Sequence, residues 1–462
     1  MYKPNVIIGV VPIKRGFLPM DEAKRQKDRF MRVIRDVKPN AVTLVDIDDL
    51  CENGIAFETA KVPAIIDKMK AAKIDALFIP FCDFGEESVA AAVAYGCDVP
   101  VLVWGNRDET VNTEVIRGRD TQCGMFAATK VLRRHGITYS YIFNCETESG
   151  DFKNGFEKFI RVVNVLKDLK SLRVAKIGER PQPFMSVMTN EAALIKRFGI
   201  TTVPISPVAI GKLTDEILQR DDDDFRAYYK DVTTRMDCSS MEDNNVKKAA
   251  AAKMAVHQLM SDSECSVGAI ECWPTCSQVL GFPICMTLGE MADAGMPISC
   301  ETDVNGAITL AILRAISLGE EAEFLADLTI RHPENDNAEL LWHCGPFPYS
   351  LKAEGSKASL VNGQEQWEMK QGDLTVCRFD DIDGEYFLFA GEAKTTTGPS
   401  TIGTYVWMET DDWKKWEERL MFGPYIHHIG VMYGKHFDVL KEAARYLGVT
   451  FDHPDACGAK SL

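Results

Sequence analysis

Short apolar runs alternate with amphipathic segments along the first part of the chain, and this pattern predicts strands and helices in turn. Continuous apolar runs, which are typical of buried parallel strands, occupy residues 5–11, 41–45, 76–81, 99–104 and 139–144. Segments with helical periodicity lie between them at 21–37, 59–72, 87–94 and 122–135. Alternating strands and helices form a parallel sheet covered on both faces. We therefore expect residues 1–172 to form a doubly wound, Rossmann- or flavodoxin-like α/β domain.

A second alternating block follows, and the pattern then changes. Strand-like runs at 172–178 and 201–205, with helical segments at 190–198, 207–235 and 245–260, predict a central α/β domain over 173–297. From residue 322 onward, shorter apolar runs are separated by Gly, Asn and Asp. Turn signals at such intervals indicate an antiparallel barrel or sandwich. Residues 298–462 are therefore expected to form a β-rich, barrel-like C-terminal domain.

Composition narrows the class of protein. The 68 Asp and Glu residues outnumber the 52 Lys and Arg residues, which argues against a nucleic-acid partner because phosphate binding needs clustered basic side chains. No apolar run reaches the roughly 18 residues of a membrane span. The 14 cysteines include no CxxC pair, so we expect reduced thiols in a cytoplasmic protein. The first strand lacks a following GxGxxG turn, and a dinucleotide site is therefore not expected there.

Two apolar runs in the middle of the chain each end in acidic residues. The run 267–270 is followed by Glu271, and the run 296–299 is followed by Glu301 and Asp303. In an open α/β sheet, ligands bind at the carboxyl ends of the strands. The acids are therefore expected to face one crevice, with Glu301 in a supporting role.

Histidine supplies the third element of a candidate metal site. Of the eight histidines, His427 and His428 are adjacent, in a segment expected to be a loop. Two carboxylates and one imidazole suit Mn²⁺ or Mg²⁺ better than Zn²⁺, which prefers Cys and His. Each residue also has a structural alternative: Glu271 as a salt-bridge partner, Asp303 as a helix cap, and either histidine as a buried core residue.

Several segments, in chain order, resemble the L-fucose isomerase and L-arabinose isomerase superfamily. They are IGERPQPFMSV, AIECWPT, SCETDVNGA, LWHCGPFP and GPYIHHIGVMYGKH. The resemblance covers nearly the whole chain and is nearest to short fucose-isomerase-like members. It implies an aldose–ketose isomerase that uses Mn²⁺, or another divalent cation such as Mg²⁺ or Co²⁺, and passes through an enediolate.

The resemblance also implies roles for individual residues. Glu271 and Asp303 would be both catalytic acids and metal ligands, and His428 would be the third ligand. His343 would lie near the site without binding the ion, and Trp407 would close the sugar pocket unless it is a core strand residue. Further substrate-binding candidates are His427, Lys14, Arg15, Cys82, Asp83 and Gln122. In this superfamily the first domain often completes a neighbouring subunit's site, which implies a homo-oligomer, trimer-based or hexameric.

Two questions of function stay open at the level of sequence. Lys14 and Arg15 suit a sugar with an anionic group, sulfonated or phosphorylated, and their structural alternative, which is slightly favoured, is solvent-exposed charge. A non-catalytic sugar-binding or regulatory protein is the alternative to an isomerase, because two α/β domains around a cleft also describe sugar receptors. The set of two acids and a histidine, with a β-rich C-terminal domain, favours the isomerase.

Overall fold

The computed structural model describes residues 2–110 and 118–456, and the chain divides into two compact units. The first unit is Lys3–Lys167, and the second is Asp168–Leu462 together with Tyr2. The domain boundaries expected at 172 and 297 stay predictions. Among the described residues, no helix is both long and apolar enough to cross a membrane.

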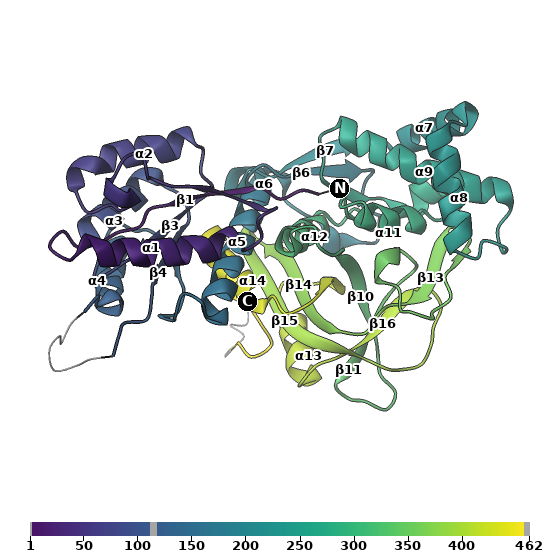
Figure 1. Ribbon diagram of the computed structural model, residues 1–462. Helices are drawn as coiled ribbons and strands as arrows, with labels where there is room; N and C mark the ends of the chain where they lie inside the picture. The colour runs from purple at the N-terminus through teal and green to yellow at the C-terminus, as the bar shows by residue number, and fades with distance from the viewer. Residues whose placement is uncertain (1, 111–117, 457–462) are drawn as a thin grey trace. The chain divides into compact units, whose positions relative to one another are not determined.

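The first unit is a doubly wound α/β domain, as the pattern predicted (Figure 1). Its parallel sheet has the order β2-β1-β3-β4-β5, the flavodoxin-like arrangement. The strands are β1 (Val6–Val10), β2 (Val42–Val45), β3 (Ala76–Phe81), β4 (Val101–Gly105) and β5 (Tyr139–Tyr141). The helices are α1 (Met20–Arg35), α2 (Val62–Ala71), α3 (Glu87–Cys97), α4 (Thr121–Arg134) and α5 (Gly150–Lys170).

Both faces of this sheet are buried by apolar side chains. Helices α2, α3 and α4 supply an aliphatic layer on one face. On the other, aromatic side chains of α1 and α5 pack against β3 and β4, with Trp104 and Phe152 ring centroids 4.1 Å apart. Burial of the strands on both sides explains their unbroken apolar runs.

The second unit combines a parallel sheet with a β-barrel. The sheet order is β7-β6-β8-β9, and its strands are β6 (Arg173–Ile177), β7 (Thr201–Ile205), β8 (Val267–Ile270) and β9 (Ile298–Ser299). The helices are α6 (Glu191–Phe198), α7 (Pro207–Arg220), α8 (Asp223–Arg235), α9 (Asp243–Asp262), α10 (Ser277–Leu280), α11 (Cys285–Asp293) and α12 (Val304–Ser317).

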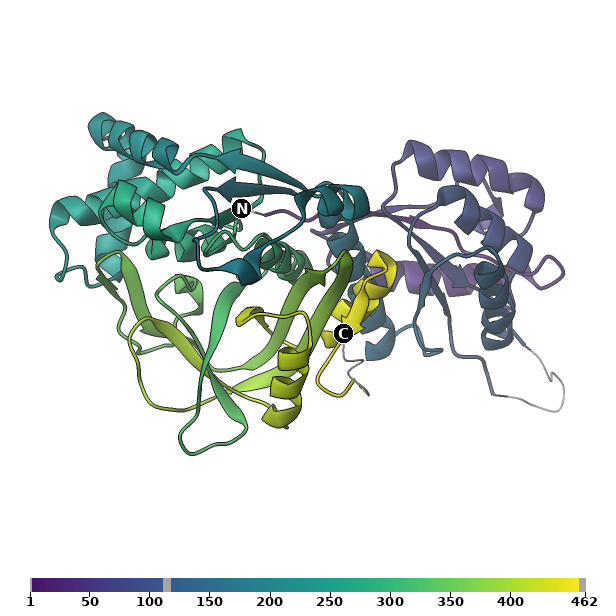
Figure 2. The ribbon, with the colours of Figure 1, turned by 180° about the vertical axis from the view of Figure 1, so that it is seen from behind.

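The barrel strands run in the order β16-β11-β10-β17-β14-β15, and pairing of β15 with β16 closes the ring (Figure 2). Of the two architectures left open by the sequence, the structure therefore has the barrel. Its strands are β10 (Phe324–Arg331), β11 (Ala338–His343), β14 (Asp373–Ile382), β15 (Glu385–Thr396), β16 (Thr404–Glu409) and β17 (His428–Tyr433). Outside the ring lie β12 (Ser359–Val361), β13 (Gln364–Glu368), β18 (Thr450–Asp452), α13 (Trp413–Phe422) and α14 (Phe437–Leu447).

Helix α12 joins sheet and barrel into one core. All its residues are buried, as its nearly continuous apolar sequence requires. It packs against β8 and β9 of the sheet and against β14 and β17 of the barrel. The approach of β17 depends on Gly430, where a Cβ would lie 2.6 Å from the Thr309 methyl group. The amino end of α12 therefore lies where the sheet and the barrel meet.

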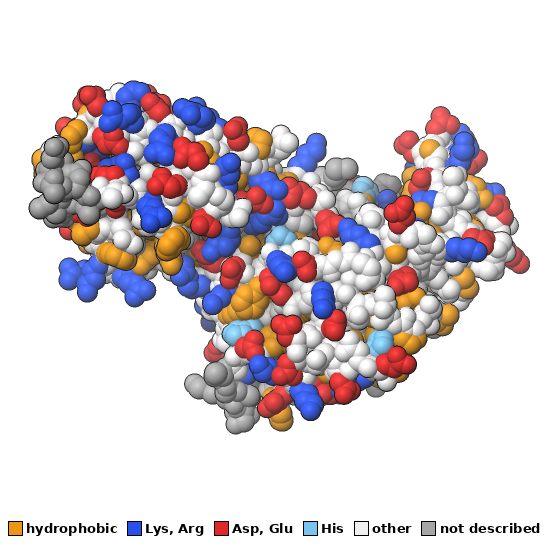
Figure 3. All heavy atoms as spheres, turned by 60° about the horizontal axis from the view of Figure 1, so that its bottom comes forward, with side chains coloured by type: hydrophobic (Ala, Val, Ile, Leu, Met, Phe, Trp, Pro, Cys, Tyr) orange, Lys and Arg blue, Asp and Glu red, His pale blue; other side chains and the backbone are white. Residues whose placement is uncertain are grey.

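Surface charge is mixed. Acidic and basic side chains are interspersed over the face drawn in Figure 3. A phosphate backbone would need basic side chains gathered on one surface, so this face offers no such footprint.

A buried acid next to β10 leads to the first prediction. Burial raises the pKa of the Glu323 carboxyl to about 8, although Arg314 partly offsets this. The folded state therefore holds a proton that the unfolded state has already lost, and stability falls as pH rises from the unfolded value of 4.5 towards 8. The slope from one such group approaches about 1.4 kcal/mol per pH unit.

We expect Glu323→Gln to remove this contribution. Urea unfolding at pH 5 to 8 should then show the variant gaining stability over the wild type as pH rises. Parallel curves for the two proteins would contradict the burial of a protonated Glu323.

Candidate active site

The site lies at the amino end of α12, where three elements end or begin together. Strands β8 and β9 deliver Glu271 and Glu301 at their carboxyl ends. The Thr302 amide donates to the Ile270 carbonyl over 3.0 Å, so the two strand ends are directly joined. His428 is the first residue of β17. The expectation of a loop is therefore wrong for His428, because pairing with Asp327 of β10 places it in the barrel.

The Glu271 carboxylate is held by two hydrogen bonds. Its Oε1 accepts from the Thr275 hydroxyl at 2.6 Å, and its Oε2 accepts from the Glu179 amide at 3.1 Å. Gly178 makes room for it, since a Cβ there would lie 2.5 Å from Oε2. Its sequence-based alternative was a salt-bridge partner, but the interactions found for its carboxylate are these hydrogen bonds. The arrangement fixes the orientation of the carboxylate at the strand end.

Asp303 is completely buried, and both oxygens of its carboxylate accept hydrogen bonds from other residues. Oδ1 accepts from the Gly306 amide at 2.8 Å, so Asp303 caps α12, as its structural alternative anticipated. The Arg378 guanidinium donates to Oδ2 at 2.6 Å and to Oδ1 at 3.1 Å. Although burial opposes it, the charge of Arg378 lowers the pKa of Asp303 well below its usual range. Oδ2 also accepts from His428 Nδ1 at 2.9 Å.

His428 is thereby oriented towards Glu301. With Nδ1 directed at Asp303, His428 Nε2 lies 3.1 Å from Glu301 Oε2. Burial works against it, but the hydrogen bond to Asp303 and the neighbouring Glu301 carboxylate raise the pKa of His428 to about 9. Glu301 has left-handed backbone, with a φ of 59°, which is uncommon outside glycine. Local backbone strain of this kind is typical of functional sites.

Four buried polar atoms converge at this point without hydrogen-bond partners in the described part of the chain. They are Glu301 Oε2, Asp327 Oδ1, His343 Nε2 and His428 Nε2. Asp327 Oδ1 is 3.6 Å from His428 Nε2 and 3.9 Å from His343 Nε2. Unpaired buried polar groups are costly, so this arrangement is suited to a ligand or ion that would satisfy them.

Among the described residues, one group has the spacing needed to hold a metal ion. Glu301, His427 and His428 each offer a ligand atom, and these atoms lie within 4.8 Å of one another. The sequence singled out both histidines but gave Glu301 only a supporting role. Metal ligation by Glu271 and Asp303 stays a prediction.

Sequence reasoning missed Asp327 and Trp273. Asp327 is the one acidic residue of β10 (FLADLTIR), and this was the available signal. Trp273 is 39% exposed, and its indole donates to Glu301 Oε1 at 2.9 Å. Phe184 packs edge-on against Trp273, with centroids 5.7 Å apart, and 6.3 Å from the His427 ring. These rings form an apolar wall beside the polar group.

Trp407 lies in a different environment. It is buried on β16 in a small cluster with Leu340 and Tyr405, and its indole donates to the Pro399 carbonyl at 2.9 Å. Its ring packs edge-on against His332. This is the packing expected of a core strand tryptophan, and the pocket-closing role stays a prediction.

The substrate-binding candidates of the first unit lie at the carboxyl ends of β1 and β3 and at the start of α4. Lys14 is buried and not solvent-exposed. Its ammonium group donates to the Arg15 carbonyl at 2.6 Å. The Arg15 guanidinium stacks 4.0 Å from the Phe84 ring centroid. Burial raises the pKa of both the Cys82 thiol and the Asp83 carboxyl. Gln122 is exposed.

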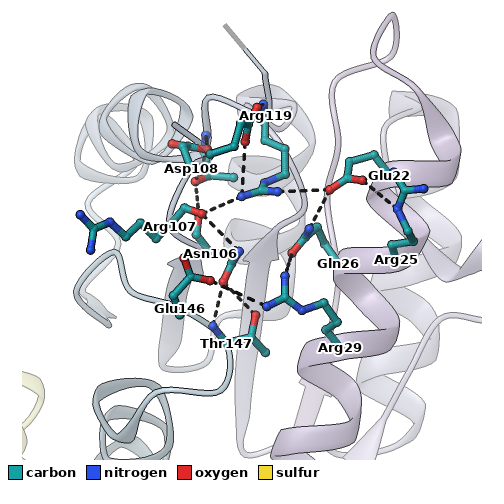
Figure 4. A network of polar contacts seen from close by, with 12 residues as sticks. Glu22, Arg25, Gln26, Arg29, Asn106, Arg107, Asp108, Arg119, Glu146 and Thr147 are labelled. Carbon is teal, nitrogen blue, oxygen red and sulfur yellow. Dashed lines mark hydrogen bonds and ion pairs between the residues drawn. The ribbon is translucent and has the colours of Figure 1, made fainter. Parts of the chain in front are cut away.

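A polar network follows the end of β4 in the same unit (Figure 4). Asn106 Oδ1 accepts from the Thr147 amide at 2.8 Å. Arg119 donates to the Arg107 carbonyl at 2.6 Å and to Glu22 of α1 at 3.2 Å. A pocket beside this network is lined by Leu18, Pro19, Glu22, Asp83, Glu109, Gly118 and Arg119. The polar groups that follow β4 are thus partly engaged with one another.

The fold and the site together define an α/β protein with a C-terminal β-barrel, in which carboxylate and imidazole groups meet where the second parallel sheet joins the barrel. Residues 9–170 match the family model described as fucose/sulfoquinovose isomerase, N-terminal domain. A sulfoquinovose isomerase of Priestia aryabhattai is 25% identical over 455 residues, covering 96% of this chain and 98% of the relative. One of Alkalicoccus urumqiensis is 28% identical over 330 residues, covering 69% and 72%. The matched N-terminal domain and the full-length similarity support the resemblance to fucose-isomerase-like proteins that the motifs indicated.

Proposed function

We propose that this protein is a divalent-metal-dependent aldose–ketose isomerase whose substrate is a sulfonated sugar of the sulfoquinovose type. The full-length relatives carry that name. The observation that carries the proposal is the convergence of unpaired buried carboxylate and imidazole atoms at the end of α12. Carboxylates and imidazoles can bind a divalent cation and transfer protons, and both steps serve sugar isomerisation through an enediolate.

Glu301, His427 and His428 would hold the cation. Carboxylate oxygen and imidazole nitrogen form a donor set that suits Mn²⁺, and two of these atoms are buried without other partners. When bound, the ion polarises the sugar carbonyl and stabilises the negative charge that develops on oxygen.

Asp303 would act by positioning His428. A hydrogen bond between Nδ1 and Asp303 fixes the ring, so that Nε2 lies 3.1 Å from Glu301 Oε2 and would bind the cation after losing its proton. Arg378 keeps Asp303 ionised and anchored from its other side. The imidazole is therefore held by one carboxylate and aimed at another.

Glu271 would transfer the carbon proton. A carboxylate held at the strand end can remove the proton from C2 of the open-chain aldose and return it to C1, giving the 2-ketose. Both oxygens already accept hydrogen bonds, so the group is oriented before substrate arrives. Trp273 and Phe184 would shield the intermediate from water.

The activity can be tested by exchange of the C2 proton with deuterated solvent in the presence of Mn²⁺. We expect exchange and ketose formation with sulfoquinovose, and much less with L-fucose, D-glucose or glucose 6-phosphate. Failure of every sugar to exchange would sink the proposal. Tight binding of one sugar without proton exchange would instead favour a non-catalytic sugar-binding protein.

Glu271→Gln is expected to lower the turnover number by roughly 10²–10⁴-fold, because the amide cannot accept the carbon proton. The matched control is Glu179→Gln, which changes a neighbouring carboxylate with 80% exposure and should leave turnover unchanged. Equal effects of the two substitutions would remove Glu271 from this role.

The proposal includes the homo-oligomer that the family resemblance predicts. Light scattering is expected to give a mass of three or six chains of 51.5 kDa.

A further inference from the structure

Two cysteines lie in contact beside His343. Cys285 is the first residue of α11 and is buried, whereas Cys344 follows β11 and is partly exposed. Their sulfur atoms are 3.3 Å apart although the residues are 59 positions apart in the chain. A disulfide needs an S–S distance of about 2.0 Å, so modest side-chain movement would join them.

Cys344 also contacts His343, a histidine of the candidate site. Cys344 Sγ lies 3.3 Å from His343 Nδ1, and the Cys344 amide donates to that nitrogen at 2.9 Å. On its other side, His343 Nε2 faces Asp327 among the unpaired polar atoms described above. A change at Cys344 therefore acts on a side chain that faces the site.

We propose that Cys285 and Cys344 form a peroxide-sensitive dithiol whose oxidation to a disulfide switches off the site through His343. The loss of activity on oxidation rests on the proposed isomerase function, whereas formation of the disulfide does not depend on it.

The chemistry is that of a two-step thiol oxidation. The Cys344 thiolate attacks one oxygen of hydrogen peroxide, which breaks the O–O bond, releases hydroxide and leaves a sulfenic acid. The Cys285 thiol, losing its proton, then attacks that sulfur and displaces hydroxide, so that two thiols and one peroxide give one disulfide and two waters. A thiol reductant reverses the reaction by exchange.

The environment supports this order of events. A hydrogen bond from Cys285, together with the neighbouring His343, lowers the pKa of the Cys344 thiol to about 5. Partly exposed thiols of low pKa beside a second cysteine are typical of redox-sensitive sites. Cys285, which is buried and has a raised pKa, would be the resolving thiol.

Formation of the bond would disturb His343 in two ways. The negative charge of the Cys344 thiolate beside Nδ1 is lost, and the sulfur is drawn towards α11. Because misplacement of a site group by about 1 Å can cost roughly 10²-fold in rate, we expect oxidation to lower turnover by that order.

The test uses the full-length protein, reduced and then treated with hydrogen peroxide. After alkylation of free thiols, mass spectrometry of a non-reducing digest is expected to show a Cys285–Cys344 cross-link. Turnover should fall as the cross-link forms and recover with dithiothreitol. In Cys285→Ser no cross-link is expected, and dimedone should trap sulfenic acid on Cys344.

Cys123→Ser is the matched control, because Cys123 is an exposed cysteine of the first unit and its loss should change neither cross-link nor turnover. If peroxide oxidises Cys123 while Cys285 and Cys344 remain free thiols, the proposed peroxide-sensitive dithiol is wrong. A cross-link with unchanged turnover would overturn the switch. If reduced protein isomerises no sugar, the proposed function fails while cross-link mapping still decides the dithiol.

Discussion

Replacing His428 or Glu301 by glutamine is expected to remove the stabilisation that Mn²⁺ gives to the folded protein. A ligand that binds only the folded state stabilises it by about 2.7 kcal/mol when its concentration is 100 times the dissociation constant. Both atoms proposed to meet the ion are buried and face each other at 3.1 Å. Losing either should weaken binding by more than the roughly 10- to 100-fold that loss of an outer partner costs.

Calorimetric titration with Mn²⁺ and thermal unfolding with and without the ion measure this effect without any sugar. His257→Gln is the matched control, since it makes the same substitution on α9, far along the chain from the group. Unchanged Mn²⁺ affinity in both His428→Gln and Glu301→Gln would contradict the assignment.

Asp303→Asn separates two interpretations of Asp303. If Asp303 only positions His428, affinity should fall by about 10- to 100-fold. If it is a ligand, as the family resemblance implies, affinity should fall as far as in His428→Gln.

Arg378→Met is expected to lower the free energy of unfolding by about 3–5 kcal/mol, because it leaves buried carboxylates without their cation. Arg378 is completely buried, and it donates to Asp303 through its terminal nitrogens and to Asp380 Oδ2 through Nε at 2.8 Å. Methionine fills similar volume, so loss of charge and not of packing dominates the change.

Urea unfolding compares this variant with Arg331→Met. Arg331 pairs with Asp336 on the surface at 3.3 Å, and such exposed pairs contribute about 0–1 kcal/mol. A similar small loss in both variants would show that the Arg378 network does not anchor the site. Loss of Mn²⁺ binding in Arg378→Met would in turn link the network to the position of His428.

The fold class could be predicted from the sequence because the patterns that indicate strands and helices involve neighbouring residues. Unbroken apolar runs such as Ala76–Phe81 are what strands buried on both faces require, and they recur with helices between them. The closure of the barrel could not be predicted, because β16 pairs both with its sequence neighbour β15 and with β11, about 60 residues earlier in the chain, and the pattern of apolar runs does not indicate that second partner.

The site was only partly predictable for a similar reason. Acids at the ends of β8 and β9, and the His427–His428 pair, could be found from the run-and-break pattern. Asp327 and Trp273 were missed, because a charged residue within β10 and an aromatic residue after β8 do not by themselves indicate which residues they contact. Trp407, in contrast, looks prominent in sequence but is packed against Leu340 and Tyr405.

The sequence by itself determined the class of fold and the neighbourhood of the site, because periodicity and strand ends are properties of adjacent residues. Only the tertiary structure decided which acid meets the histidine. Two residues apart in a strand, Glu301 and Asp303 would point the same way, but positive φ values at Glu301 and Thr302 turn the chain between them. Asp303 is thereby directed to Arg378 and His428 Nδ1, and Glu301 to His428 Nε2.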